Sequence, residues 1–271
     1  MTPASPWLLV PMGMATGLVG SLLGLGGGVF LVPLLTLAMG VPIRVAVAAS
    51  LISVIATASA SATVSLKRGL VNMRLGLALE VATSVGGLLG GITSSLLGRR
   101  ELFVGFGLTL SMMGIVMALR ANRRNSIADA SVDPGLLGGR FEERGQAYVY
   151  RAKRLPLALC SSLVAGAISG LLGLGGGIIK VPVLSSFCGI PIRVAAATST
   201  FMIGVTAAAS AFIYFGRGQI DLPLTAAIAI GTLPGSLLGA RLSEQVQARS
   251  LKIIMAIVLL LVAVRMLMEG L

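Results

Sequence analysis

The sequence predicts an all-α polytopic membrane protein built from two homologous halves. Of its 271 residues, 56% are hydrophobic and only 11% are charged. An ordinary soluble protein carries about 25% charged residues, so the composition excludes an ordinary soluble enzyme and a disordered chain. The apolar residues form long runs such as Leu251–Met268. Such runs indicate membrane helices, because the strands of an outer-membrane barrel alternate apolar and polar residues.

The second half of the chain repeats the first. The heptapeptide LLGLGGG occupies Leu22–Gly28 and recurs at Leu171–Gly177, 149 positions later. With this offset held, 18 of the 29 positions from Leu22 to Ser50 are identical in the second copy. Duplicated halves are typical of secondary transporters, in which two similar units meet at a central site.

The repetition divides the chain into three parts. We predict a first transmembrane repeat at 1–120, a linker at 121–154 and a second transmembrane repeat at 155–271. The linker is basic and contains a turn signal, Asp133-Pro134-Gly135, so we interpret it as a partly disordered cytoplasmic segment. The expected helices of the first repeat are Trp7–Leu23, Val29–Met39, Val45–Leu66, Met73–Leu97 and Leu102–Leu119; those of the second are Leu155–Leu172, Ile178–Cys188, Val194–Phe215, Leu222–Leu242 and Leu251–Met268.

The short segment Val29–Met39 decides the topology. Eleven helical residues cover about 16 Å, roughly half of the hydrocarbon core. The segment therefore either continues a broken helix, which gives parallel repeats, or turns back as a re-entrant arm, which leaves three full crossings per half and inverted repeats. Loop charge favours inversion, because it puts the two more basic loops on the linker's side. Those loops contain Lys67, Arg68 and Arg74, and Arg241, Arg249 and Lys252.

The charged and metal-ligating residues limit the function classes. The formal net charge is +12, and the charges stand in short loops between apolar runs. We interpret this as positive-inside topology, and we expect no nucleic-acid partner. The chain has no histidine, and Cys160 and Cys188 form no CxxC pair, so we expect no metal, no cofactor and no enzyme active site.

The two glycine breaks, Gly24–Gly28 and Gly173–Gly177, are the candidate substrate site. Unwound backbone survives inside a membrane only where it is buried in protein or lines a wet cavity. The first amides of the short helix after each break lack helical partners, which predicts an anion site near the midplane. The alternative is tight helix packing, which we favour for Gly86, Gly90, Gly91, Gly235 and Gly239. The predicted binding residues are Gly24, Gly26, Gly27, Gly28, Val29, Ser50, Gly173, Gly175, Gly176, Gly177, Ile178, Lys180, Thr198 and Ser199.

Four charged residues are candidates for binding, gating or coupling. Lys180 and Glu80 lie inside apolar runs, where an unpaired charge costs several kcal/mol, so each should face a partner, a cavity or a substrate. We expect Lys180 to add positive charge to the anion site. Glu80 is either a protonatable coupling group, a counter-ion to a basic residue or a carboxylate that reaches the interface. Arg44 and Arg193 either guide anions at the two mouths or anchor the helices at the interface.

The doubled motifs resemble the sulfite exporter TauE/SafE family. The resemblance rests on GLGGG followed by Val32-Pro33 and Val181-Pro182, and on Gly-x-Pro-x-Arg-x-Ala at Gly40–Ala46 and Gly189–Ala195. It also includes the similar turns Arg68–Asn72 and Arg217–Asp221. The resemblance implies a multi-pass secondary carrier in the bacterial inner (cytoplasmic) membrane.

We therefore predict an exporter of a small sulfur-containing anion, such as sulfite, sulfoacetate or another organosulfonate, that works by alternating access around the glycine breaks. The alternatives are an anion channel, or an importer of the same fold that carries a different small anion. The expected partners are the anion and the lipid bilayer, with a homodimer left open.

Overall fold

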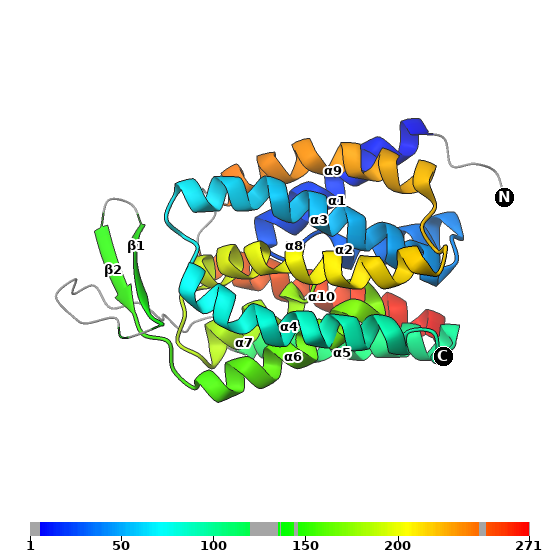
Figure 1. Cartoon of the computed structure of the whole chain (residues 1–271). Helices are drawn as coiled ribbons and strands as arrows, with labels where there is room; N and C mark the ends of the chain where they lie inside the picture. Colours follow the sequence, from blue (N-terminus) through cyan, green and yellow to red (C-terminus); the bar gives the residue numbers. More distant parts are fainter. Residues whose placement is uncertain (1–5, 120–134, 136, 144–145, 244–247, 271) are drawn as a thin grey trace.

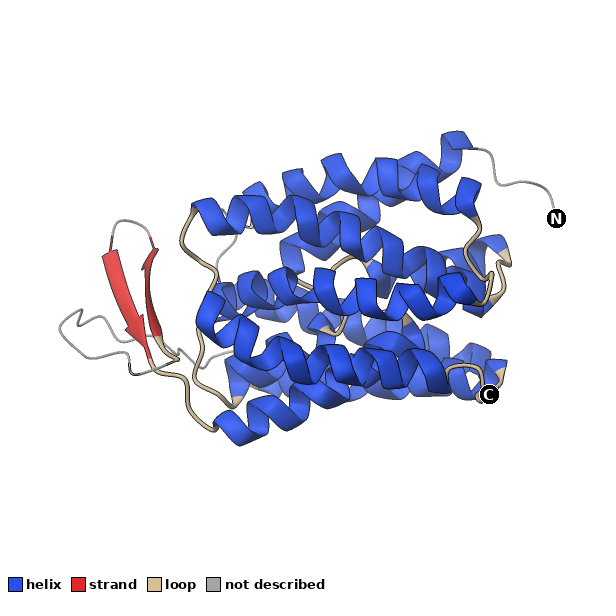
Figure 2. Cartoon of the chain, in the orientation of Figure 1, coloured by secondary structure: helices blue, strands red, loops and turns tan. Residues whose placement is uncertain are grey.

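The computed structural model is a bundle of helices with one small β-hairpin (Figures 1 and 2). It describes residues 6–119, 135, 137–143, 146–243 and 248–270. The first half contains α1 (Pro6–Leu23), α2 (Gly28–Pro33), the π-helical turn η1 (Leu34–Ala38), α3 (Ile43–Lys67), α4 (Met73–Thr93) and α5 (Arg99–Leu119). The second half contains α6 (Leu155–Leu172), α7 (Gly177–Ser186), α8 (Ile192–Gly216), α9 (Leu222–Leu242) and α10 (Ala248–Gly270).

The all-α membrane architecture predicted from the sequence is confirmed. Among the described residues, five helices are long and apolar enough to cross a membrane: α3, α4, α6, α8 and α9. The expected helix Val29–Met39 differs, because it is divided into α2 and the π turn η1 at Pro33. Proline has no N–H to donate to the preceding turn, so the helical hydrogen-bond pattern is interrupted there.

The linker contains structure that the sequence analysis did not predict. Strands β1 (Gly139–Glu143) and β2 (Gln146–Tyr150) pair as an antiparallel hairpin, in which Gly139 lies opposite Tyr150. Asn72 holds the hairpin against the bundle. Its side-chain amide donates to the Leu137 carbonyl and to the Tyr150 hydroxyl, both at 2.9 Å. The expected turn at Asp133-Pro134 lies outside the described residues.

The helices lie side by side, with the hairpin at one end of the bundle and both the start of α1 and the end of α10 at the other (Figure 1). We call these the linker end and the far end. Helices that occupy equivalent places in the two halves run in opposite directions: α3 and α5 run towards the linker end, whereas α8 and α10 run away from it. The salt bridge of 3.0 Å between Arg99, at the start of α5, and Glu269, at the end of α10, reflects this antiparallel pairing.

The two halves exchange helices. Helix α1 packs on α9, and α4 packs on α6. Glycines make both contacts close: a Cβ at Gly235 would overlap the Met14 carbonyl oxygen, and a Cβ at Gly86 would overlap that of Leu163. Gly90 and Gly239 likewise face backbone carbonyls, of Ala167 and Leu18. The packing interpretation of these four glycines is confirmed, because any side chain there would push the helices apart.

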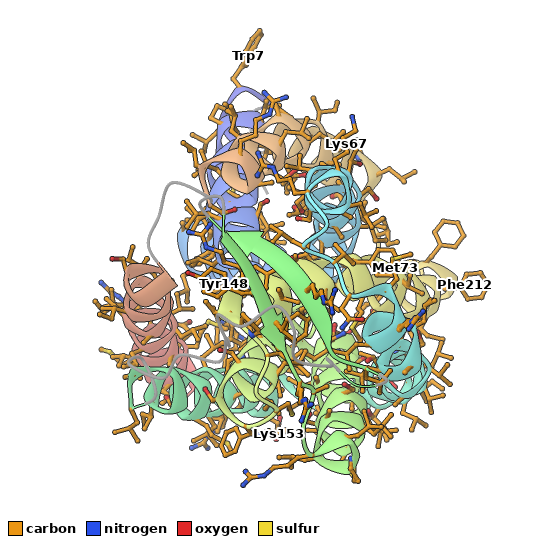
Figure 3. All side chains as sticks on the ribbon, turned by 90° about the vertical axis from the view of Figure 1, so that its left-hand side faces the viewer. Trp7, Lys67, Met73, Tyr148, Lys153 and Phe212 are labelled. Atoms are coloured by element: carbon orange, nitrogen blue, oxygen red, sulfur yellow. The ribbon has the colours of Figure 1, made fainter. Side chains whose placement is uncertain are left out.

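The outer surface of the bundle is apolar and its interior carries the polar groups. Helix α4 exposes Leu77, Val81 and Ile92 on one face and buries Glu80 and Thr83 on the other. Viewed from the linker end, Trp7 and Phe212 point away from the bundle (Figure 3). This arrangement suits a protein surrounded by lipid, in which polar side chains face the protein interior.

Candidate substrate site

The two glycine breaks meet at the centre of the bundle. Gly26 and Gly175 face the same two side chains, Val54 of α3 and Ile203 of α8. Both glycines have positive φ, 83° at Gly26 and 71° at Gly175, a conformation that other residues rarely adopt. After each break the chain turns back along the helix it came from, so that Gly27 lies against the Thr16 carbonyl. The two interrupted segments are therefore direct neighbours across the halves.

The breaks also interlock. The Ser50 hydroxyl on α3 donates to the Gly173 carbonyl at 2.7 Å, which joins the first half to the second break. A Cβ at Gly28 would overlap the same carbonyl, and a Cβ at Gly177 would lie 2.8 Å from the Gly24 carbonyl oxygen. Ser50, one of the predicted binding residues, thus has a structural partner.

The centre of the crossing is tightly filled. Leu25, Val29, Leu174 and Ile178 are all at most 1% exposed. Some of the backbone amides are also engaged, because the Leu25 amide donates to the Gly20 carbonyl at 2.8 Å and the Gly173 amide donates to that of Ser169 at the same distance. The short helices that follow differ in length, since α2 has six residues and α7 has ten.

Lys180 and Glu80 form a buried ion pair beside the second break. The Lys180 ammonium lies 4.0 Å from Glu80 Oε2, and the Lys180 side chain is 1% exposed. Oε1 of Glu80 accepts hydrogen bonds from the hydroxyls of Thr206 (2.8 Å) and Ser84 (2.9 Å). Of the roles that the sequence left open for Glu80, the structure provides the counter-ion. The ion pair joins α7 to α4. The hydrogen bond from Thr206 links the Glu80 carboxylate to α8 as well.

A cavity of about 40 Å³ opens beside the first break, towards the linker end. It has room for about three water molecules. Two predicted residues, Gly24 and Arg193, line it. The other polar groups in its wall are hydroxyls, and the full lining is Ser21, Leu22, Gly24, Ser61, Ser65, Leu70, Arg193, Ala196, Ala197, Thr200, Ala240 and Ser243. The side chain of Ser21 is buried, and its hydroxyl has no hydrogen-bond partner among the described residues.

Three further predicted residues, Thr198, Ser199 and Arg44, differ in their hydrogen-bond partners. The Thr198 hydroxyl accepts a hydrogen bond of 2.9 Å from the backbone N–H of Asn72, which links Thr198 to the α3–α4 loop. Ser199 is fully buried, and its hydroxyl has no partner within the described part of the chain. Arg44 donates to the carbonyls of Leu97 (3.0 Å) and Ser95 (3.4 Å) at the far end, so it fastens the turn that follows α4.

Comparison with known proteins agrees with this architecture. Residues 9–266 match the family model described as sulfite exporter TauE/SafE. The chain belongs to the sulfite exporter TauE/SafE family. It is similar to the probable membrane transporter protein YunE of Bacillus subtilis, with 28% identity over 97% of both chains. The probable membrane transporter protein MJ0441 of Methanocaldococcus jannaschii is 25% identical and covers 93% of this chain and 91% of its own. No solved structure matches the chain.

Membership of the TauE/SafE family makes the chain a multi-pass membrane transporter and confirms the resemblance seen in its motifs. The sequence analysis nevertheless missed Ser21, Ser65 and Thr200, which line the cavity. Single hydroxyls in apolar helices carry a weak signal, because most of them bond to their own backbone. A comparison at the 149-residue offset would have singled out Ser65, since its equivalent is the much larger Tyr214.

Proposed function

We propose that this TauE/SafE transporter is a secondary carrier that exports a small sulfur-containing anion, such as sulfite, sulfoacetate or another organosulfonate. The observation that carries the proposal is the cavity lined by Arg193 and several hydroxyls, which lies against the first glycine break. The family's description as sulfite exporter supports both a sulfur oxyanion as the substrate and export as the direction of transport. The chain moves its substrate without changing it chemically and is not an enzyme.

The chemistry of the cavity suits an oxyanion. A guanidinium supplies a permanent positive charge and several N–H donors, and charge-assisted hydrogen bonds are about twice as strong as neutral ones. The hydroxyls of Ser21 and Thr200 add donors without adding charge. Among the residues that the structure describes, no acidic side chain that would repel an anion lines the cavity. Sulfite and sulfonates present several oxygens to such a ring of donors.

The carrier works by alternating access between two inverted repeats. Three observations support this: the 149-residue repetition, the opposite directions of α3 and α8, and the meeting of both breaks at Val54 and Ile203. In this scheme the cavity at the linker end represents the state open to that side. The membrane is the bacterial inner membrane, and the linker end faces the cytoplasm, where the more basic loops belong.

The test measures flux in proteoliposomes loaded with sulfite, sulfoacetate, taurine or sulfate. We expect saturable transport of a sulfur-containing anion and accumulation against its gradient when a suitable ion gradient is imposed. Flux that never saturates and never accumulates would replace the carrier by a channel. Absence of flux for every anion would overturn the proposed function.

The Arg193→Gln variant tests the cavity itself. Loss of charge-assisted hydrogen bonds of about 1.5–3 kcal/mol should raise the substrate concentration for half-maximal flux roughly ten- to hundredfold. Lys67→Gln is the matched control, because it removes an exposed positive charge from the linker end outside the cavity. Equal effects of the two substitutions would show that Arg193 acts only through the general surface charge.

A further inference from the structure

The two ends of the bundle differ at one pair of equivalent positions. At the linker end, Ser65 of α3 lines the cavity together with Ser21 and Leu22 of α1. The residue 149 positions after Ser65 is Tyr214 of α8, and the residues equivalent to Ser21 and Leu22 are Gly170 and Leu171 of α6. The far end therefore offers the same framework with a much larger side chain.

Tyr214 occupies the space that corresponds to the cavity. Its side chain is 1% exposed, and its hydroxyl donates to the Gly170 carbonyl at 2.9 Å and is 3.3 Å from that of Leu171. Ser94 lies beside the same hydroxyl, and Arg44 donates to the carbonyl of the next residue, Ser95, at 3.4 Å. Arg44 and Ser94 are the equivalents of Arg193 and Ser243, which line the cavity at the linker end. Tyr214 thus has around it the counterparts of four residues in the cavity wall.

Other side chains narrow the far end in the same way. Val47 and Leu51 stand where Ala196 and Thr200 line the cavity. Arg217 closes the rim above Tyr214 by donating to the carbonyls of Gly91 (2.9 Å) and Ile92 (3.0 Å) at the end of α4. Tyr214 is the largest of these differences, and it bridges α8 to the last turn of α6 before the second break.

We propose that Tyr214 is the plug that closes the far end of the transport path, and that its ring fills what would otherwise be a second anion cavity. The role of this plug in transport rests on the proposed function. Whether the ring closes the far end to solvent depends on packing alone and can be tested without a substrate. Release to the far side then requires the ring to leave its place between α6 and α8. The substrate is the same small oxyanion, for which Arg44 would take the part that Arg193 plays at the linker end.

Thiol labelling from each side of the membrane tests the plug without any substrate. The background is Cys160→Ser; the remaining Cys188 is buried, and burial raises the pKa of its thiol to about 11, so the thiol stays protonated and unreactive near neutral pH. Ala197→Cys reports on the cavity, and Ala48→Cys reports on the equivalent place at the far end. Lys67→Cys and Leu96→Cys mark the linker side and the far side.

With the native Tyr214, a membrane-impermeant maleimide should label Ala197→Cys from the linker side and leave Ala48→Cys unlabelled from either side. Tyr214→Ser should increase labelling of Ala48→Cys from the far side at least tenfold. Ser65→Tyr should abolish labelling of Ala197→Cys. A Tyr214→Ser protein that is folded, as judged by size-exclusion chromatography, and yet leaves Ala48→Cys unlabelled would overturn the proposal.

Tyr214→Phe separates the volume of the ring from its hydrogen bond. The ring alone should keep Ala48→Cys unlabelled, because a phenyl group fills nearly the same space. If Tyr214→Phe opens the far end as fully as Tyr214→Ser, the hydroxyl acts as a latch and the plug by volume is wrong. Because labelling needs no transport, the plug can fail while flux is intact, and flux can fail while the plug holds.

Discussion

The two halves of this transporter share a framework and differ at a few buried positions. Both halves place a glycine break at the same pair of side chains, Val54 and Ile203, and both begin the next long helix with an arginine. The residues equivalent to the buried ion pair Lys180–Glu80, however, are apolar: Leu31 in the first half and Ala229 in the second. The comparison teaches that the residues shared by the halves form the crossing, whereas the residues that differ make its two faces unequal.

Removing one member of the buried ion pair gives the largest expected effect. Glu80→Ala leaves the Lys180 charge buried without its counter-ion, which should cost about 3–5 kcal/mol in the free energy of unfolding. The double variant Glu80→Ala with Lys180→Leu introduces the apolar residues of the equivalent positions, Ala229 and Leu31, and should regain most of that loss. Thermal unfolding of the purified protein in detergent measures both variants.

A double variant as unstable as Glu80→Ala would contradict this account, because the ion pair would then support packing that apolar residues cannot replace. Flux adds a separate readout. A stable double variant that no longer accumulates substrate against a gradient would assign the pair to coupling between α4 and α7, in addition to its structural role.

Adding one methyl group at equivalent positions of the two breaks should give the next largest effect. At Gly28 the new Cβ meets the Gly173 carbonyl, whereas at Gly177 it meets first the Ile203 side chain at 2.6 Å. Overpacking costs about 1–3 kcal/mol, and Gly28→Ala should lie at the upper end because backbone moves less readily than a side-chain end. Gly105→Ala, which would meet nothing within 4 Å, is the neutral control for thermal unfolding.

The smallest expected effect concerns the two equivalent serines. Ser50→Ala removes the hydrogen bond to the Gly173 carbonyl and should destabilise the protein by about 1 kcal/mol or somewhat more. Ser199→Ala removes a buried hydroxyl that has no partner among the described residues, and should leave stability unchanged or slightly higher. Equal losses in thermal unfolding would mean that the two serines are interchangeable. A loss of substrate affinity in Ser199→Ala alone would support its predicted place in the site.

Much of the fold could be predicted because it depends on local signals. The long helices follow from apolar runs, and the two breaks follow from a repeated run of closely spaced glycines. The hairpin at Gly139–Tyr150 escaped prediction, since its short strands sit in a basic segment that lacks a long apolar pattern. The π turn after Pro33 depends on how the interrupted helix packs against its neighbours, and the local sequence pattern does not predict that packing.

The site was predictable in its components and not in their contacts. The sequence indicated that Lys180 and Glu80 each need a partner, but only the packing of α4 and of α7 against α6 and α8 brings the two together. The position of the cavity depends on the small volume of Ser65, compared with Tyr214 at the other end. Such a difference is visible in the sequence only once the halves are aligned and the space around each residue is known.

The exchange of helices between the halves has a mechanical consequence. Helix α1 is pressed backbone to backbone on α9, and α4 is pressed in the same way on α6. Neither contact can open without exposing closely packed glycine backbone, so we expect each pair to move as one piece. In the proposed alternating access, each rigid body would therefore combine helices from both halves of the chain, and the hinge between the bodies would not follow the boundary between the halves.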